Sequence, residues 1–287
     1  MKQFGPIGLL HPGEMGAAVG GVLAGEHPVW WASSGRSPAS VRRASAAGLI
    51  DVGSVETIRD GCELILSICP PEAARDVARQ VAGFQGVYLD ANAIAPTTAR
   101  EVAALVEQGG GTYLDGGIIG GPPTTGSRGT RLYLSGPGGE RISELFSGTA
   151  VDARVLSDDL TAASALKMCF AAWTKGTTAL LLDIRALAEA LGETGALLAE
   201  WEGSMPELKD RSLSAAQQAV TKGWRWRAEM EEIARTFRDA DLPDGFHQAA
   251  SEIYGALTRD AEATIAPSTL DEVIRALRHG RTGVSAS

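Results

Sequence analysis

The chain has 287 residues and a formal net charge of -9, and 44% of its residues are hydrophobic. This hydrophobic content is enough for two packed domains and excludes a disordered chain. The acidic balance argues against a nucleic-acid partner, and the lack of an uncharged apolar window of about 18 residues argues against a membrane span.

The cysteines and histidines follow no metal-binding or disulfide pattern. Cys62, Cys69 and Cys169 show no C-x-x-C spacing, and the four histidines form no ligand motif. Neither a metal site nor a disulfide framework is expected. The N-terminus does not have the pattern of a secretory signal peptide. We therefore expect a soluble cytoplasmic protein that handles a small molecule.

The first half of the chain alternates short apolar runs with helical segments. Continuous apolar runs of this kind predict strands that are buried on both faces, and their alternation with helices predicts a parallel sheet. The expected strands are Ile7–Leu10, Val29–Ala32, Leu64–Ile68, Val87–Asp90, Tyr113–Asp115 and Arg131–Ser135, with helices at Ala73–Ala82 and Thr97–Gln108 among others. Residues 1–157 are therefore predicted to form an α/β domain with a doubly wound sheet of the Rossmann type.

After about Asp152 no further strand pattern is expected. A long alanine-rich helix is predicted from Leu160 to Leu191, where Gly192 stops it. At 1.5 Å per residue it would span roughly 48 Å. Shorter helices are expected at Leu213–Val220, Trp226–Asp239, Phe246–Leu257 and Leu270–Leu277. Residues 158–287 are thus predicted to form an all-α domain joined to the first by a long interdomain helix.

The stretch "HPGEMG" follows the first predicted strand. Gly13 and Gly16 stand at the second and third glycines of the dinucleotide fingerprint G-x-G-x-x-G, whereas His11 replaces the first glycine and Pro12 lacks an N–H. The helix then begins near Met15, after Glu14, and its N-terminus would face a pyrophosphate. The alternative is an ordinary glycine turn.

The second predicted strand runs into "WWASSGRSPASVRR", which contains no acid to bind a ribose 2′-hydroxyl. Ser34, Arg36 and Ser37 offer a cation and hydroxyls, which suit a 2′-phosphate. This pattern favours NADP over NAD. The alternative is that Arg36, Arg42 and Arg43 only solvate a helix start.

Six stretches together resemble the 6-phosphogluconate dehydrogenase / β-hydroxyacid dehydrogenase superfamily, which includes the imine reductases. In chain order they are "IGLLHPGEMG", "GRS", "LSICPP", "LDANAIAP", "LDGGIIGGPP" and "ALKMCFAAWTKGT". The branch that the chain resembles most carries a C-terminal domain of unknown function, DUF1932. The resemblance implies that Cys69 and Pro70 lie under the nicotinamide ribose and that Asn92 lies beside the nicotinamide. For Cys69 the alternative is a buried small hydrophobic residue.

The resemblance also marks departures at the substrate pocket. Ile119, followed by Gly120 and Gly121, stands where β-hydroxyacid dehydrogenases have a serine that holds the substrate carboxylate. Lys167 is kept, but Ala171 replaces the asparagine that follows it in those relatives. The substrate pocket is therefore expected to be more apolar than theirs.

Lys167 is the main catalytic candidate of the long helix. With about 100° per residue, Ala171, Thr174 and Thr178 lie on the same helical stripe as Lys167. Desolvation on such a face would lower the pKa of the lysine. The alternative is a surface lysine, with Lys175 as the second choice of catalytic group.

These features predict an NADP(H)-dependent oxidoreductase that transfers hydride between nicotinamide and a small hydroxyl or carbonyl compound. Lys167 would relay the proton, assisted by Asn92 and Thr174. An imine reductase on the same scaffold and a non-catalytic NADP-binding protein are the alternatives. A homodimer formed through the long helix is also expected.

Overall fold

The computed structural model describes residues 5–124, 126, 129–260 and 262–279. The chain divides into two compact units, Met1–Met168 and Cys169–Ser287. This division falls inside the long helix α7 (Ala162–Leu191), whereas the sequence analysis placed the boundary at residue 157. The first turns of α7 thus belong to the N-terminal unit.

The N-terminal unit is built on one eight-stranded sheet with the strand order β3-β2-β1-β4-β5-β6-β7-β8. The prediction of a Rossmann-type α/β fold followed by helices is confirmed. The strands are β1 (Ile7–Leu10), β2 (Val29–Trp31), β3 (Ile50–Asp51), β4 (Leu64–Ser67), β5 (Val87–Asp90), β6 (Thr112–Ile119), β7 (Thr130–Ser135) and β8 (Val151–Ser157). Each of the six predicted strands corresponds to one of these.

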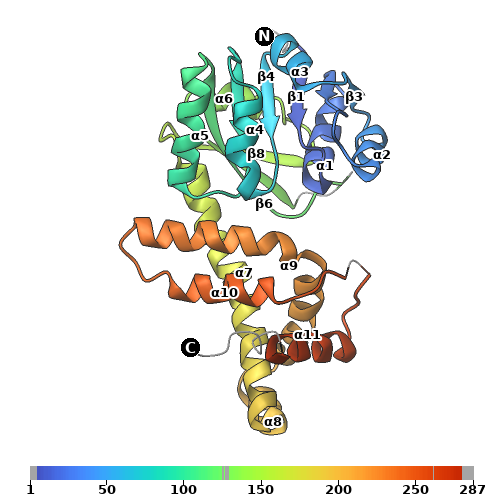
Figure 1. The fold of residues 1–287 in the computed structure, drawn as a ribbon, viewed down its shortest axis with the longest axis vertical. Coiled ribbons are helices and arrows are strands. Elements are labelled where there is room, and N and C mark those ends of the chain that lie inside the picture. Colours follow the sequence, from blue (N-terminus) through green and yellow to red (C-terminus); the bar gives the residue numbers. More distant parts are fainter. Residues whose placement is uncertain (1–4, 125, 127–128, 261, 280–287) are drawn as a thin grey trace. The chain divides into compact units, whose positions relative to one another are not determined.

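Helices cover both faces of this sheet (Figure 1). One face packs against α1 (Glu14–Ala24), α2 (Pro38–Ala46) and α6 (Gly139–Glu144). The other packs against α3 (Val55–Gly61), α4 (Ala74–Gln80) and α5 (Pro96–Gln108), with the 3₁₀ turn η1 (Pro71–Ala73) before α4. The continuous apolar runs are explained by this double coverage, because β1 and β4 are buried along their whole length.

Two expectations for the sheet were wrong. The sheet is not wholly parallel, because β6 and β7 pair antiparallel with Gly117 opposite Tyr133. The segment between them forms no described helix, so the chain turns back beside β6 instead of crossing over a face. The strand pattern also does not end near Asp152, because β8 lies at the sheet edge, with Val151 buried and only Ala153 and Val155 partly buried after it.

The C-terminal unit is helical in its described residues. It contains the rest of α7, then α8 (Thr194–Ser204), α9 (Glu207–Asp239), α10 (Gly245–Gly255) and α11 (Pro267–His279). The predicted stop of α7 at Gly192 is confirmed, since this glycine has φ of 77° and Glu193 N–H donates to the carbonyl of Ala188 at 2.8 Å.

Helix α9 replaces two shorter predicted helices. The sequence analysis separated them around Gly223, but the helix runs through that residue. A Cβ at Gly223 would lie 3.1 Å from the ring of Tyr254 in α10. The glycine therefore permits close packing of α9 on α10 and does not interrupt the helix. Among the described residues, no helix combines the length and hydropathy that a membrane span needs.

Candidate functional site

The sheet order reverses at β1, with β2 and β3 on one side and β4 to β8 on the other. In open α/β sheets, ligands bind at this switch point, beyond the carboxyl ends of the strands. His11, Arg36, Cys69 and Asn92 follow the ends of β1, β2, β4 and β5. The fold thus brings the predicted cofactor residues to one edge of the sheet.

The turn after β1 depends on the backbone of His11, whose φ is 65°. Glycine adopts this left-handed conformation without strain, and few other residues adopt it at all. His11 therefore takes the conformation that the first glycine of the fingerprint would have. Its carbonyl accepts the N–H of Gly13 at 2.8 Å. A Cβ at Gly16 would lie 2.5 Å from the same oxygen, so that position requires glycine.

Helix α1 begins at Glu14 with Gly13 as its N-cap, and no side chain caps it. A Cβ on Gly13 would meet no atom within 4 Å, so the space before the first turn is open. Glu14 is exposed, while the side chain of Met15 packs on the core of the sheet. The N–H groups of this turn and the helix dipole favour an anion there.

Arg43 of α2 holds the turn from the other side. Its Nε donates to the carbonyl of Pro12 at 3.3 Å, and its Nη2 donates to Ser40 Oγ at 3.2 Å. Pro12 itself is buried. From the sequence, Arg43 was expected only to solvate the start of a helix, because its hydrogen-bond partner lies 31 residues away. In the structure Arg43 is a support of the turn.

Arg36 is the cation of the loop after β2. It is half-buried, and the structure gives its guanidinium no hydrogen-bond or ion-pair partner among the described residues. Burial lowers the pKa of Arg36. Burial and, second, the charge of Arg36 lower the pKa of His11 to about 4, so this imidazole is neutral at pH 7. Its Nδ1 is buried without a hydrogen-bond partner in the described structure.

The serines of this loop have local roles. Ser37 Oγ accepts the N–H of Ser40 at 3.2 Å and caps α2. Ser34 is exposed, and its N–H donates to the carbonyl of Gly53 at 3.1 Å. Asp51, at the end of the neighbouring strand β3, accepts the N–H of Ser33 at 3.1 Å. The sequence analysis missed this acid, which shapes the loop through its backbone.

Asn92 connects the ends of β4 and β5. Its Oδ1 accepts the N–H of Cys69 at 2.6 Å, and its Nδ2 donates to Ser67 Oγ at 3.1 Å. Asn92 N–H donates to Asp90, whose buried carboxyl has a pKa raised by desolvation to about 7. Burial also raises the pKa of the Cys69 thiol to about 12, so it is not a nucleophile. Cys69 and Asn92 are thus adjacent, and Pro70 begins the turn into η1.

Asp115 attaches the start of α7 to β6. Its carboxylate accepts the N–H of Ser164 at 2.7 Å and the hydroxyl of Ser164 at 2.6 Å. Ser135 Oγ donates to Asp115 at 3.1 Å and accepts the N–H of Ala163 at 2.9 Å. A carboxylate at a helix N-terminus is a favourable pairing. The sequence analysis did not identify this anchor. The acid before two glycines in "LDGG" was the one feature of the sequence that could have indicated it.

Gly117 lets the helix lie against the strand. A Cβ there would lie 2.7 Å from the carbonyl of Ala163 and 3.2 Å from Lys167 Cβ. Lys167 lies at this close contact, and its Nζ donates to the carbonyl of Ile118 at 2.7 Å. Among the described residues it has no carboxylate partner. Desolvation lowers the pKa of Lys167 to about 8.

The other residues predicted to contact substrate lie at the end of β6 and just after it. Ile119 is buried at the end of the strand. Gly120 has φ of 119°, and a Cβ there would lie 2.3 Å from the carbonyl of Gly129, so only glycine fits. Gly121 is exposed, and its carbonyl accepts Thr130 Oγ1 at 2.6 Å. These two glycines serve the backbone of the turn.

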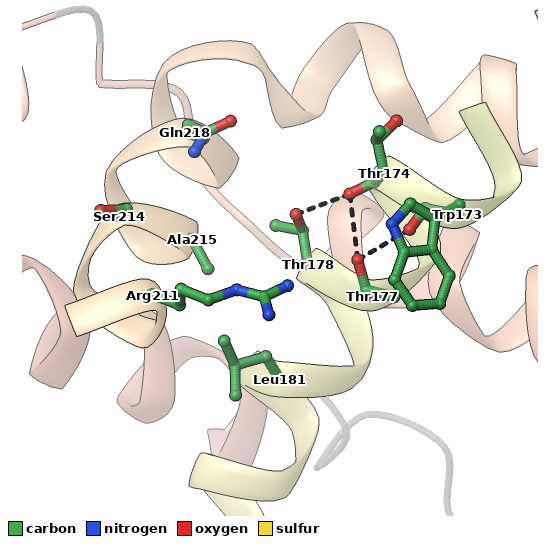
Figure 2. A pocket seen from close by; sticks show the side chains of 9 residues that line it. All are labelled: Trp173, Thr174, Thr177, Thr178, Leu181, Arg211, Ser214, Ala215 and Gln218. Atoms are coloured by element: carbon green, nitrogen blue, oxygen red, sulfur yellow. Dashed lines mark hydrogen bonds between the residues drawn. The ribbon is translucent and has the colours of Figure 1, made fainter. Parts of the chain in front are cut away.

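Two predicted residues lie in the C-terminal unit, further along α7. Ala171 is buried. Thr174 lines a cavity of about 250 Å³ between α7 and α9, together with Thr178 (Figure 2). Its hydroxyl donates to the carbonyl of Phe170 at 3.1 Å. The described residues hold no cluster of three or more His, Cys, Asp or Glu side chains that could bind a metal.

The comparisons with known proteins give a family match over part of the chain. Residues 188–257 match the model of the domain of unknown function DUF1932. None of the curated proteins matches the sequence significantly.

Solved structures resemble the whole chain. A conserved hypothetical protein from Sinorhizobium meliloti is 21% identical over 96% of this chain and 97% of that one, with a TM-score of 0.69. The 3-hydroxyisobutyrate dehydrogenase from Mycobacterium tuberculosis is 17% identical over 96% and 100%, with a TM-score of 0.68. A reductive aminase from Aspergillus terreus, in complex with NADPH, is 19% identical over 88% and 93%, with a TM-score of 0.53. The chain therefore contains a DUF1932 region and has the fold of hydroxyacid dehydrogenases and reductive aminases.

Proposed function

We propose that this protein is an NADP(H)-dependent oxidoreductase acting on a small carbonyl or hydroxyl compound. The observation that carries the proposal is the uncapped start of α1 at the switch point of the sheet, with the unpaired Arg36 beside it. An open space, a helix N-terminus and a guanidinium fit a dinucleotide that bears a 2′-phosphate. The Aspergillus terreus reductive aminase binds NADPH on the same fold.

The residues at this edge have distinct tasks in the proposal. The N-terminus of α1 would bind the pyrophosphate, and Arg36 would bind the 2′-phosphate. His11 and Pro12 would shape the turn before α1. Cys69, Pro70 and Asn92 would lie along the nicotinamide riboside. The nicotinamide, when bound, supplies the hydride chemistry.

Lys167 is the proposed proton donor and acceptor. A lysine ammonium has three N–H donors, and one of them is used by the carbonyl of Ile118. With a pKa near 8, the group is mainly protonated at pH 7 and can change its charge within the working range of an enzyme. It would protonate the oxygen of a carbonyl during reduction and take the hydroxyl proton during oxidation.

Ile119 and Ala171 stand where β-hydroxyacid dehydrogenases have polar residues. This difference bears on which of two substrate classes the protein accepts. Both side chains are buried and apolar, which removes two polar contacts that a hydroxyacid would use. An imine is the second candidate for this reason, and the Aspergillus terreus enzyme is a reductive aminase on the same fold. A non-catalytic NADP-binding protein is the third.

A homodimer is also part of the proposal. Helix α7 exposes apolar side chains along one face, and three of them, Trp173, Leu180 and Leu187, are seven residues apart, which is the heptad spacing of a helix–helix seam. The exposed side chains are Phe170 at 42% exposure, Trp173 at 68%, Leu180 at 42%, Leu187 at 58% and Leu191 at 67%. A second copy of this chain would cover them, because a two-fold axis pairs one such stripe with itself.

The test is a titration with NADPH and NADH followed by a turnover screen. We expect NADPH to bind more tightly than NADH and to reduce at least one member of a panel of small ketones, aldehydes and cyclic imines. Turnover of carbonyls alone would assign carbonyl–alcohol chemistry, and turnover of cyclic imines alone would assign the imine alternative. Tight NADPH binding without any turnover would support the non-catalytic alternative, and preference for NADH would contradict the cofactor assignment.

A further inference from the structure

The cavity between α7 and α9 is a polar cavity in a place where two packed helices usually meet through apolar side chains. Its lining is shown in Figure 2 and comes wholly from the C-terminal unit. We propose that it is a binding site for a small organic carboxylate with an apolar body. This site shares no residue with the nucleotide edge of the sheet, and the proposal does not depend on the oxidoreductase function.

Two direct contacts hold the helices on either side of this cavity. Lys175 of α7 forms an ion pair with Glu229 of α9. Arg185 of α7 donates to Ser212 Oγ of α9 at 2.7 Å. The cavity residues of α7 include Thr178 and Leu181, which lie between the two anchoring positions along the helix. Direct contacts between α7 and α9 therefore hold the two helices that line the cavity.

Hydrogen-bond donors of α9 face the cavity without a partner. Arg211, Ser214 and Gln218 recur along one face of α9 at helical spacing. Within the residues that the structure describes, none of these three side chains has a hydrogen-bond or ion-pair partner. Figure 2 shows the Arg211 side chain extended toward the threonines of α7. A guanidinium with hydroxyl and amide donors around it matches a carboxylate.

The threonines of α7 do not satisfy these donors. Thr177 donates to the carbonyl of Trp173 at 2.7 Å and Thr178 to that of Thr174 at 2.9 Å. Their hydroxyl hydrogens are thus directed to their own helix, so the donors available to a ligand are those of α9. Only one cation lines the cavity, so a singly charged carboxylate fits better than a phosphate dianion.

Apolar groups and the size of the cavity define the rest of the ligand. Trp173, with 68% of its surface exposed, and Leu181 form apolar parts of the lining. The volume of about 250 Å³ corresponds to roughly eight waters at the density of the liquid. A flat or compact body of benzoate size would place its ring against Trp173 and its carboxylate at Arg211.

The cavity shares Trp173 with the exposed stripe of α7 but not Arg211, Ser214 or Gln218. A change at Arg211 therefore tests ligand binding apart from dimer formation. Arg227 is a matched control on the same helix, because it is an exposed arginine whose ion pair with Glu231, at 3.4 Å, lies outside the cavity.

The experiment is isothermal titration calorimetry of the full chain with benzoate at constant ionic strength. The neutral analogue benzamide, hexanoate and inorganic phosphate are titrated in parallel, and each variant is checked by its thermal melting curve. We expect one saturable benzoate site. Arg211→Gln should weaken it at least about tenfold, since hydrogen bonds to charged groups are worth that much. Arg227→Gln should leave it unchanged, benzamide and phosphate should bind more weakly, and NADPH should not displace benzoate.

Several results would overturn the proposal. These are the absence of saturable binding by either carboxylate, equal weakening by both arginine variants, displacement of benzoate by NADPH, and phosphate binding as tight as benzoate binding. A change of molecular mass in Arg211→Gln with unaltered benzoate binding would also overturn it, because the cavity would then be part of an interface between copies. Arg211→Lys keeps the charge and loses the planar fork, and an intermediate affinity would support carboxylate recognition by the fork.

Discussion

Two lysines lie about two turns apart on α7, and their surroundings differ in kind. Lys175, in the C-terminal unit, is ion-paired with Glu229, lies 5.9 Å from the ring of Trp226, and its carbonyl accepts the hydroxyl of Tyr254 at 2.7 Å. Lys167, in the N-terminal unit, donates only to the carbonyl of Ile118 among the described residues. Lys175 is paired with a carboxylate, whereas desolvation lowers the pKa of Lys167 to about 8, so that Lys167 can release its proton near neutral pH. The comparison supports a structural role for Lys175 and the proposed acid–base role for Lys167.

The largest expected effect is on catalysis at Lys167. Lys167→Met keeps a long side chain with good helix propensity. Turnover should fall by roughly 10²–10⁴-fold, which is the usual contribution of a positioned acid or base. NADPH affinity, measured by fluorescence titration, should be retained, because the phosphate contacts come from other elements. Near-wild-type turnover on the best substrate would remove Lys167 from the mechanism and make Lys175, the second candidate from the sequence, the next residue to test.

The corresponding substitution at Lys175 should lower the free energy of unfolding and not the turnover. Lys175→Met leaves Glu229 buried without its cation, and breaking such a pair costs about 3 kcal/mol of unfolding free energy. Urea denaturation measures this loss, and turnover per folded molecule should change little. The double variant Lys175→Met/Glu229→Gln should recover part of the loss, because no uncompensated charge is then buried. If Lys175→Met instead lost activity at full stability, the division of roles between the lysines would be wrong.

Arg36 tests whether the N-terminal unit leaves its cations unpaired for a ligand. Arg36→Ala should raise the Michaelis constant for NADPH by about 10–100-fold, the value of hydrogen bonds to a charged group. The constant for NADH should barely move, because NADH has no 2′-phosphate. Arg42→Ala, an exposed arginine in α2, is the control. Equal effects on both cofactors would contradict the assignment to the 2′-phosphate.

The stripe of α7 tests the structural role of the C-terminal unit. Leu187→Glu puts a charge into the proposed seam twice, once from each copy. The dimer dissociation constant, measured by analytical ultracentrifugation, should rise at least about tenfold. Ala199→Glu adds the same charge at an exposed position of α8, outside the stripe, and should have no effect. A wild-type monomer at micromolar concentration would contradict the homodimer.

The smallest expected effect is a pH dependence of the reaction rate that comes from Lys167 alone. Its pKa in the folded protein is lowered by desolvation from 10.5 to about 8. Reduction needs the protonated ammonium, so its rate should fall as the pH rises through 8, whereas oxidation needs the neutral amine and should become faster. Rate profiles in both directions measure this, and Lys167→Met should lack both limbs. Limbs that persist in the variant would belong to another group.

The main strands were predictable, and the edges of the sheet were not. Strands such as β1 and β4 are buried on both faces and therefore appear as continuous apolar runs. In contrast, β3 has only the two residues Ile50–Asp51, and β8 is an edge strand in which only Val151 is buried. Such strands are defined by their neighbours, which a single sequence does not display.

The candidate site was predictable where it follows from topology. Parallel strands end at one edge, so the positions of His11, Arg36 and Cys69 follow from the strand order. The support of the site was missed, because it consists of side chains distant in sequence. Asp115 and Ser164 are separated by 49 residues, and no local pattern links a strand acid to a later helix. The conformation of His11 was also hidden, since composition does not reveal a backbone angle.

The attachment of α7 to β6 bears on how such a scaffold can diversify. Asp115 and Ser135 fasten the first turn of the helix, and Gly117 brings it into contact with the strand. The position of the Lys167 ammonium is therefore fixed by the position of β6 in the sheet. Neither Ile119 nor Ala171 contributes a side-chain hydrogen bond to that attachment, so a substitution at either position leaves the attachment of Lys167 to the sheet intact. Under the proposed function, one framework of this kind would accept different substrates through changes at such positions while Lys167 keeps its place.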